Sequence, residues 1–360
     1  MDIQSNLEDW ANGIEDYSQR LSAHSKETVT MKRMADVIIC RAQGDSAPAF
    51  LDRFEAGSFE PAKDRGSLMR FIVKVPRMPW GLSNLPLEND PFMEVLHPAI
   101  KQRSPLKHNN LVSLIGLDTS FGRFPGLVLE YCPYGDLTRF KSLVAPNEKD
   151  LEKYVGQLAI IYARVSGGAY TRSFQMRDIL QGLQYLHGLP SAIAHGDLTP
   201  ENILVDGKGT LKLSTISFAR LAASRPSHKQ LQKGALTIDD AISARYLSPE
   251  LLDIAWPTPK SDMWSFGCVA FWLFTDLQPY SKLRREYQIV AAIDSGQLPH
   301  GMGSTTDIEE LGSQLVSGAS SHWITNGTML HILRCWDAQL NGRPTAAEFL
   351  KFLDTTAPGA

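Results

Sequence analysis

Cysteine is scarce in this sequence, with four residues among 360, and no two of them form a Cys-x-x-Cys pair. Scattered single cysteines exclude a small domain held together by disulfides, and none has a histidine at metal-ligand spacing. We therefore expect Cys40, Cys132, Cys268 and Cys335 to be buried thiols of a protein in a reducing compartment. We expect the protein to be located in the cytoplasm, with the nucleus as the alternative location.

Long apolar runs are missing as well. The best of them, Cys268–Phe274, is far shorter than the ~20 residues that cross a bilayer. The sequence also has no excess of positive charge. Its 36 Lys and Arg residues are balanced by 39 Asp and Glu residues, and the formal net charge is −3. This balance does not suit a protein that coats nucleic acid or an anionic membrane, so we expect neither as a partner.

The composition is that of a globular protein with a sizeable core, with 43% hydrophobic and 21% charged residues. At ~150 residues per domain, the length predicts about two folding units. In the polar segment 1–35, apolar residues recur every three or four positions, at Leu7, Trp10, Ile14 and Tyr17. This spacing predicts an amphipathic helix, and we assign residues 1–35 to an N-terminal helical extension.

Short β-like runs follow this extension. Val37–Cys40, Phe71–Val75 and Leu127–Leu129 are rich in β-branched and aliphatic residues. We therefore predict a small β-rich unit over residues 36–132.

The remaining chain has helical periodicity, and we predict helices over 176–187, 260–274, 286–294 and 346–354. The β-like pair Ile203–Val205 and Leu211–Leu213 interrupts them, and the Asp206-Gly207 dipeptide between the two runs predicts a hairpin. The result is an α+β fold whose larger, mainly helical unit covers 133–355, with 145–172 as an insertion and 356–360 as a tail.

The segment His195–Asn202 leads directly into this hairpin. Phosphoryl transfer to a hydroxyl needs a carboxylate that orients the incoming oxygen and an oxygen ligand for the metal on the nucleotide. Asp197 and Asn202 have the residue types and spacing for these two roles. An aspartate that only caps a turn would not need the attached Pro-Glu-Asn-Ile-Leu-Val.

This segment resembles the catalytic loop of the protein kinase family, H-R-D-L-x-x-x-N. Three further segments resemble kinase motifs in the family's order: Ser248–Glu250 is similar to A-P-E, Asp262–Gly267 to D-x-W-S-x-G, and Gly342–Thr345 to the R-P-T stretch. The residues of these three motifs are most similar to those of the tyrosine-kinase-like branch of the family, which is common in fungi. Aminoglycoside and choline kinases also carry H-G-D and a following Asn, but they lack these three motifs.

The resemblance implies a bilobal protein-kinase fold, with a five-stranded sheet and one helix before a mainly helical lobe. It also implies structural roles for four residues. Glu250 and Arg343 would form an ion pair, and Asp262 would brace the main chain of the catalytic loop at His195.

The resemblance further implies a nucleotide site. Lys74 would bind the α- and β-phosphates of ATP. Leu129 would be the gatekeeper beside adenine, and the main chain at Glu130 and Cys132 would hydrogen-bond the base. Leu204 would pack beneath the adenine ring.

Two positions of the small unit depart from the family. The segment Glu55–Glu60 is the best match to the phosphate-cradling G-x-G-x-F-G, yet it keeps only Gly57 and Phe59 and adds glutamates. The helix residue that pairs with the lysine in kinases is Ala99 here. Pro98 precedes it and should break the helix, and Glu94 lies too far around the helix to take over.

The D-F-G position departs most. The alignment places Thr215 where the metal-binding aspartate belongs, and Ile216 and Ser217 replace the Phe and Gly. Because magnesium prefers carboxylate and phosphate oxygens, only Asn202 is left as a candidate metal ligand, and Mg²⁺ binding is disfavoured. The loss of the metal-binding carboxylate should slow phosphoryl transfer roughly a thousandfold or more. Gly196 replaces the arginine of H-R-D, which removes control through a phosphorylated loop.

These observations predict a pseudokinase, a catalytically impaired protein that serves a protein partner in signalling as a scaffold or allosteric partner. ATP binding stays open. The alternative is a weak or atypical ATP-dependent Ser/Thr kinase that uses Asp197, Asn202 and Lys74.

Overall fold

The computed structural model describes residues 15–16, 21–32, 35–42, 70–76, 90–144, 169–218, 221, 244–253, 256–301 and 326–355. The chain divides into two compact units, which we call the N-terminal unit (1–107 and 113–131) and the C-terminal unit (108–112 and 132–360). The phosphate-loop candidate with Gly57 and Phe59, the segment 145–168 and the tail 356–360 lie outside the described residues.

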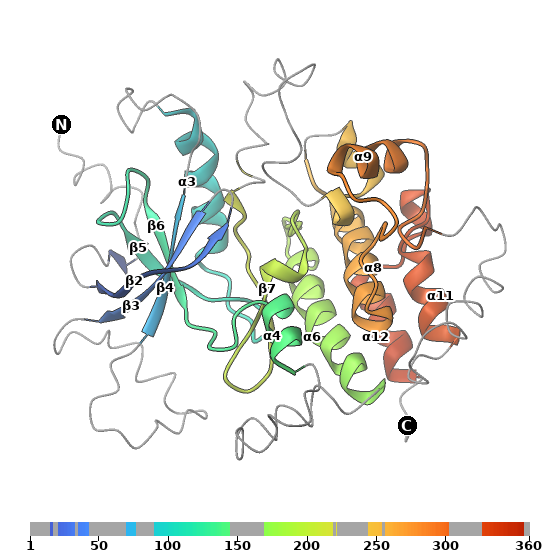
Figure 1. Cartoon of the computed structure of the whole chain (residues 1–360), viewed down its shortest axis with the longest axis horizontal. Helices are drawn as coiled ribbons and strands as arrows, with labels where there is room; N and C mark the ends of the chain where they lie inside the picture. The colour runs from blue at the N-terminus through green and yellow to red at the C-terminus, as the bar shows by residue number, and fades with distance from the viewer. Residues whose placement is uncertain are drawn as a thin grey trace. The chain divides into compact units, whose positions relative to one another are not determined.

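The N-terminal unit is built on one sheet with the strand order β1-β5-β6-β4-β3-β2 (Figure 1). The strands are β1 (Glu15–Asp16), β2 (Leu21–Lys32), β3 (Ala35–Ala42), β4 (Arg70–Pro76), β5 (Leu114–Asp118) and β6 (Gly126–Glu130). All neighbours are antiparallel except β1 and β5. The expected five strands are therefore six, because the two-residue β1 adds a parallel edge beside β5.

The helical prediction for residues 1–35 is wrong where the structure describes this segment. Leu21–Lys32 forms strand β2, which pairs with β3 from Leu21 opposite Ala42 to Lys32 opposite Ala35. The consecutive residues Thr28, Val29 and Thr30 are β-branched, a type that favours strands. The apolar spacing that suggested a helix ends before this strand begins.

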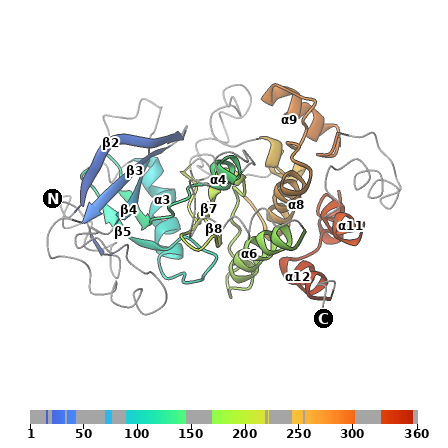
Figure 2. The ribbon, with the colours of Figure 1, turned by 60° about the horizontal axis from the view of Figure 1, so that its bottom comes forward.

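One helix, α3 (Pro91–Arg103), lies along the sheet of the N-terminal unit (Figures 1 and 2). Asp90 caps it by accepting a hydrogen bond from the Phe92 N–H at 2.9 Å. The helix continues through Pro98, so the predicted break is wrong. Pro98 is exposed, and the Glu94 carbonyl that loses its helical partner at this proline can be hydrated instead.

The N-terminus of α3 is anchored to the connection between β5 and β6. Arg123 Nη2 lies 3.1 Å from the Asp90 carboxylate, and the rings of Phe92 and Phe124 meet edge to face at 5.3 Å. These contacts fix the start of the helix while its buried face, which includes Leu96 and Ile100, packs in the core.

The C-terminal unit is mainly helical. Its helices are α4 (Leu137–Val144), α6 (Ala169–His187), α8 (Pro259–Thr275), α9 (Glu286–Asp294), α11 (Asn326–Arg334) and α12 (Ala346–Thr355). The four predicted helices are confirmed, as α6, α8, α9 and α12. Figure 2 shows α8 between α6 and α11, with α12 beside α6.

Helix α8 forms the core of this unit. Every residue from Ser261 to Phe274 is buried, which explains why its sequence is apolar on all sides. It begins with a capping box, in which Thr258 accepts from the Ser261 N–H and the Ser261 hydroxyl accepts from the Thr258 N–H. In the part of the chain that the structure describes, no helix is long and apolar enough to cross a membrane.

The predicted hairpin is confirmed as β7 (Ile203–Val205) and β8 (Leu211–Leu213), paired antiparallel. Residues 108–112 dock against its second strand. The Val112 N–H donates to the Leu213 carbonyl at 2.9 Å, and the Leu213 N–H donates to the Asn110 carbonyl at 2.8 Å. These two hydrogen bonds attach residues 110–112 to the second strand of the hairpin.

Candidate active site

Asp262 of α8 holds the main chain of the catalytic-loop candidate, residues 195–202. The buried Asp262 carboxylate accepts hydrogen bonds from the main-chain N–H groups of His195 at 2.7 Å and Gly196 at 2.8 Å. It also contacts His187 Nε2 at 2.8 Å, at the end of α6. The bracing of the loop that the resemblance implies is therefore present in the geometry.

Gly196 has a main-chain φ of 79°, in the left-handed region. A residue with a Cβ pays roughly 1–2 kcal/mol for this conformation, and glycine does not. The replacement of the family's arginine by glycine thus removes strain from the loop in addition to removing a charge.

Asp197 and Asn202 meet as the sequence predicts. The Asn202 Nδ2 donates to the main-chain oxygen of Asp197 at 2.9 Å and to its carboxylate Oδ2 at 2.8 Å. A second donor was not foreseen: the Ser217 hydroxyl donates to the same Oδ2 at 2.5 Å. Asp197 as a whole is 8% exposed, so the residue is largely withdrawn from water.

The residues at the D-F-G position follow β8 and are buried, from Ser214 to Ser217. The Ser214 N–H donates to the Asn202 carbonyl at 2.9 Å, which fastens this segment to the catalytic loop. Thr215 is thus held in the interior, where it offers only a hydroxyl.

The described side chains around this loop offer one carboxylate, that of Asp197, as a possible oxygen ligand for a magnesium ion. Asp197 is the carboxylate at hand, and its Oδ2 is engaged by two hydrogen-bond donors. Among the described residues, no three His, Cys, Asp or Glu side chains gather as metal ligands. Magnesium requires an octahedron of oxygens, and Thr215 contributes no charge toward one.

Lys74 lies inside the sheet of the N-terminal unit. It is buried on β4, opposite Val37 on β3 and Leu127 on β6. On α3, Glu94 is exposed and Ala99 is buried. The residue predicted to take the place of the kinase glutamate is therefore an interior alanine.

The strand register offers a second candidate for the phosphate loop beside the segment with Gly57 and Phe59. In the kinase motif G-x-G-x-x-G-x-V, the valine comes two residues after the last glycine. Val37 is the β3 residue opposite Lys74, and if it is taken as this valine the glycine positions would fall at Thr30, Lys32 and Ala35.

This assignment leaves no glycine in the loop. Thr30 and Lys32 belong to β2 and pair with β3, and residues 33–34 alone join the two strands. The segment 43–69, which contains Gly57 and Phe59, joins the opposite end of β4, where Arg41 pairs with Arg70.

The four predicted adenine-site residues fall in two units. Leu129 and Glu130 end β6 in the N-terminal unit, where the Glu130 N–H donates to the Ser113 carbonyl at 3.1 Å. Cys132 and Leu204 belong to the C-terminal unit, Cys132 being buried and Leu204 lying on β7.

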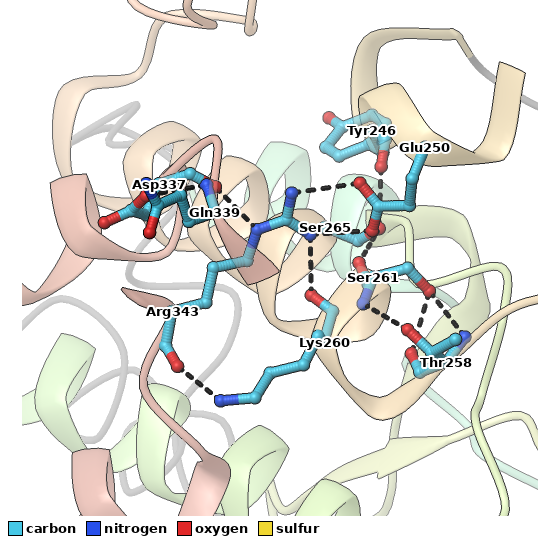
Figure 3. Close-up of polar contacts among 9 residues, drawn as sticks. All are labelled: Tyr246, Glu250, Thr258, Lys260, Ser261, Ser265, Asp337, Gln339 and Arg343. Atoms are coloured by element: carbon cyan, nitrogen blue, oxygen red, sulfur yellow. Dashed lines mark hydrogen bonds and ion pairs between the residues drawn. The ribbon is translucent and has the colours of Figure 1, made fainter. Parts of the chain in front are cut away.

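The ion pair expected between Glu250 and Arg343 is present and is bidentate (Figure 3). Arg343 Nη1 lies 2.7 Å from Glu250 Oε1, and Nη2 lies 2.9 Å from Oε2. The guanidinium also donates to the carbonyls of Lys260 at 3.0 Å and Asp337 at 2.9 Å, and it faces the Trp264 ring at 5.0 Å. We call Arg343 and these four residues the framework cluster.

This cluster satisfies a charge that the fold has buried. The Arg343 side chain is 1% exposed, and a buried guanidinium is costly unless its donors are filled. Burial alone would raise the pKa of Glu250, but the hydrogen bonds and charge of Arg343, a main-chain hydrogen bond and the Ser248 hydroxyl together hold this pKa below its ordinary value. The pair is therefore ionised at neutral pH.

Arg245 is a structural residue that sequence reasoning missed. Its guanidinium donates to the carbonyls of Pro279 at 2.7 Å, Tyr280 at 3.0 Å and Leu283 at 2.8 Å. These contacts fix the short helix Ala244–Tyr246 against the segment between α8 and α9. No sequence signal marks it, because its partners are main-chain oxygens far along the chain.

The chain matches the family model described as protein kinase domain over residues 98–352. It is 26% identical over 259 residues to the human receptor-interacting serine/threonine-protein kinase 1, covering 70% of this chain and 33% of that protein. It is 30% identical over 202 residues to serine/threonine-protein kinase PKH2 of Saccharomyces cerevisiae, covering 54% of this chain and 16% of the relative.

Serine/threonine-protein kinase VIK of Arabidopsis thaliana is 26% identical over 254 residues, which cover 69% of this chain and 47% of the relative. The chain thus spans less than half the length of these curated relatives. The similarity lies in the segment where the catalytic loop, the hairpin and the framework cluster are found.

Proposed function

This chain belongs to the protein kinase family, and we propose that within it the protein is a pseudokinase, impaired in phosphoryl transfer, that serves a protein partner in signalling as a scaffold or allosteric partner. Kinase domains in general bind ATP, and ATP is the nucleotide we test for. We propose the cytoplasm as its location.

The observation that carries the proposal is Thr215 at the metal-binding position. Kinases hold the metal on the phosphates with an aspartate here, and the metal neutralises charge that develops during transfer. A buried threonine hydroxyl supplies no such charge. The expected loss is several kcal/mol of transition-state stabilisation, roughly a thousandfold in rate.

Two features of the N-terminal unit support the proposal. A hairpin closed by residues 33–34 replaces a glycine loop whose backbone N–H groups would approach the phosphates. Ala99 replaces the helix glutamate that orients the lysine. Both changes weaken the hold on a triphosphate independently of Thr215.

The alternative is a weak or atypical Ser/Thr kinase. The contact between Asn202 and Asp197 favours it, since this pair keeps the residue types of a working catalytic loop. In that case Asp197 would orient the hydroxyl of a protein substrate and Lys74 would bind the phosphates. The matched relatives named serine/threonine kinases are also consistent with it.

A thermal-shift titration with ATP, run with excess magnesium and with EDTA, tests the proposal. A ligand of the native state raises the melting temperature by mass action. For the unchanged protein we expect no shift, or one that is the same in both buffers. For Thr215→Asp we expect a shift that requires magnesium, because the added carboxylate offers the ion an oxygen ligand.

Thr215→Asn is the matched control, since asparagine has the size of aspartate without its charge. It should behave like the unchanged protein. A magnesium-dependent shift in the unchanged protein, together with phosphate transfer that Asp197→Ala abolishes, would favour the weak kinase and contradict the pseudokinase.

A further inference from the structure

We propose that Ser217 is a restraining residue that holds Asp197 in an unreactive state, as a second block on phosphoryl transfer beside Thr215. The inference rests on the proposed function, in which Asp197 is the carboxylate of an impaired phosphotransfer site. Ser217 acts through Asp197 and need not touch a substrate.

The first step of the argument is occupancy. A carboxylate oxygen has two lone pairs for hydrogen bonds. At Asp197 Oδ2, one accepts from the Asn202 amide at 2.8 Å and the other from the Ser217 hydroxyl at 2.5 Å. A substrate hydroxyl that approaches this oxygen has to displace one of these donors.

The second step is basicity. A hydrogen bond donated to a carboxylate stabilises its charged form, and bonds to charged groups are the short and strong ones. The Ser217 contact is short, and Asp197 and Ser217 are both buried, where water competes little for either group. Asp197 is thereby a poorer acceptor for the proton of an incoming hydroxyl.

The third step is the origin of the contact. Ser217 stands at the glycine of D-F-G, a residue without a side chain, so the family's motif has no donor at this place. The segment is fixed upstream by the bond from the Ser214 N–H to the Asn202 carbonyl. The serine hydroxyl therefore reaches Asp197 from a backbone that is already tied to the catalytic loop.

The test compares variants in the Thr215→Asp background and, in parallel, in the unchanged protein. Ser217→Ala removes the hydroxyl, and Ser217→Gly is a second variant that restores the family's residue. Ser217→Thr keeps a hydroxyl, and Ser214→Ala removes a buried hydroxyl from the same segment. The measurement is transfer of the γ-phosphate from ATP with magnesium to dephosphorylated casein, with kcat and KM for ATP determined separately.

We expect Ser217→Ala and Ser217→Gly to raise kcat about tenfold or more over their parent, since a hydrogen bond to a charged group has about this weight. The KM for ATP should stay within about twofold. Ser217→Thr and Ser214→Ala should match the parent. A purely structural role for Ser217 would not produce this split between the hydroxyl-free and hydroxyl-bearing variants.

Equal rates in Ser217→Ala, Ser217→Gly and their parent, including no transfer in any of them, would overturn the restraint. So would an equal gain in Ser217→Thr, or phosphate found by mass spectrometry on Ser217 itself, which would make it an acceptor. If the unchanged protein already transfers phosphate, the pseudokinase proposal fails, yet Ser217→Ala in that background still tests the restraint.

Discussion

Two polar clusters of the C-terminal unit differ in what the sequence has kept. The framework cluster around Arg343 retains the residue pair that the kinase motifs imply, with the guanidinium bound on three sides. The proposed catalytic cluster has Asp197 and Asn202, and it has the hydroxyls of Thr215 and Ser217 at the positions where the predicted alignment expects a metal ligand and a glycine.

The difference shows that the kinase motifs contain two kinds of residue: those that stabilise the fold and those that perform phosphoryl transfer. A buried guanidinium whose partner is lost costs several kcal/mol, so an intact framework cluster contributes strongly to the stability of the unit. Replacing a metal-binding carboxylate by a neutral residue relieves a buried charge and leaves the fold unharmed. The kinase chemistry can therefore be lost while the kinase fold remains.

The largest effect we predict is on stability, from Arg343→Ala. Removing the guanidinium leaves the Glu250 carboxylate partly buried without its partner and the carbonyls of Lys260 and Asp337 without this donor. The free energy of unfolding should fall by about 3–5 kcal/mol. Urea titration of the full chain, followed by tryptophan fluorescence, measures the change.

Arg177→Ala is the matched control. Arg177 pairs with Asp354, an ion pair between α6 and α12 in which the Asp354 side chain is exposed. Its loss should cost about 1 kcal/mol or less. Similar losses in the two variants would contradict the role of burial in the framework cluster.

The next largest effect should come from Asp262→Ala. The substitution leaves the buried N–H of His195 and the N–H of Gly196 without their acceptor, at a cost of about 2–4 kcal/mol. Asp262→Asn keeps one accepting oxygen and should lose less. Hydrogen exchange of these two amides checks the cause, since both should exchange faster in Asp262→Ala, whereas unchanged protection would contradict it.

The smallest effect we predict is the response of stability to acid. Burial lowers the pKa of His300 from 6.5 to about 4. The unfolded chain then binds a proton at a higher pH than the folded one, so stability is complete above the unfolded pKa and falls as pH drops from 6.5 toward 4. At about pH 5 the loss should be about 1–2 kcal/mol relative to neutral pH.

The variant His300→Phe should flatten this part of the stability curve, measured by urea titration across the same pH range. Glu250 affects stability at a lower pH than His300 does. Because its pKa in the folded protein is below the ordinary value, the stabilisation from its ion pair is present above the ordinary glutamate pKa and is lost as the pH falls through the folded-state pKa. An unchanged slope in His300→Phe would show that another group takes up the proton.

Much of the fold was predictable because its elements are short-range patterns. The hairpin at Asp206 and helix α9 follow from neighbouring residues, and both match the structure. The N-terminal helix was mispredicted because an apolar spacing near Tyr17 was extended into Leu21–Lys32, where pairing with β3 decides the conformation. Pro98 was misjudged because exposure of the proline lets water replace the missing bond.

The candidate site also has a part that the sequence predicts and a part that only the folded structure determines. The sequence by itself indicated the kinase family and the pairing of Asp197 with Asn202, because motif order and spacing are properties of the chain. The role assigned to Thr215 stays a prediction. Only the tertiary structure revealed that Ser217 reaches Asp197 and that Val37 faces Lys74 across the sheet. Hydrogen bonds and strand register join residues far apart along the chain, and folding alone decides which of them meet.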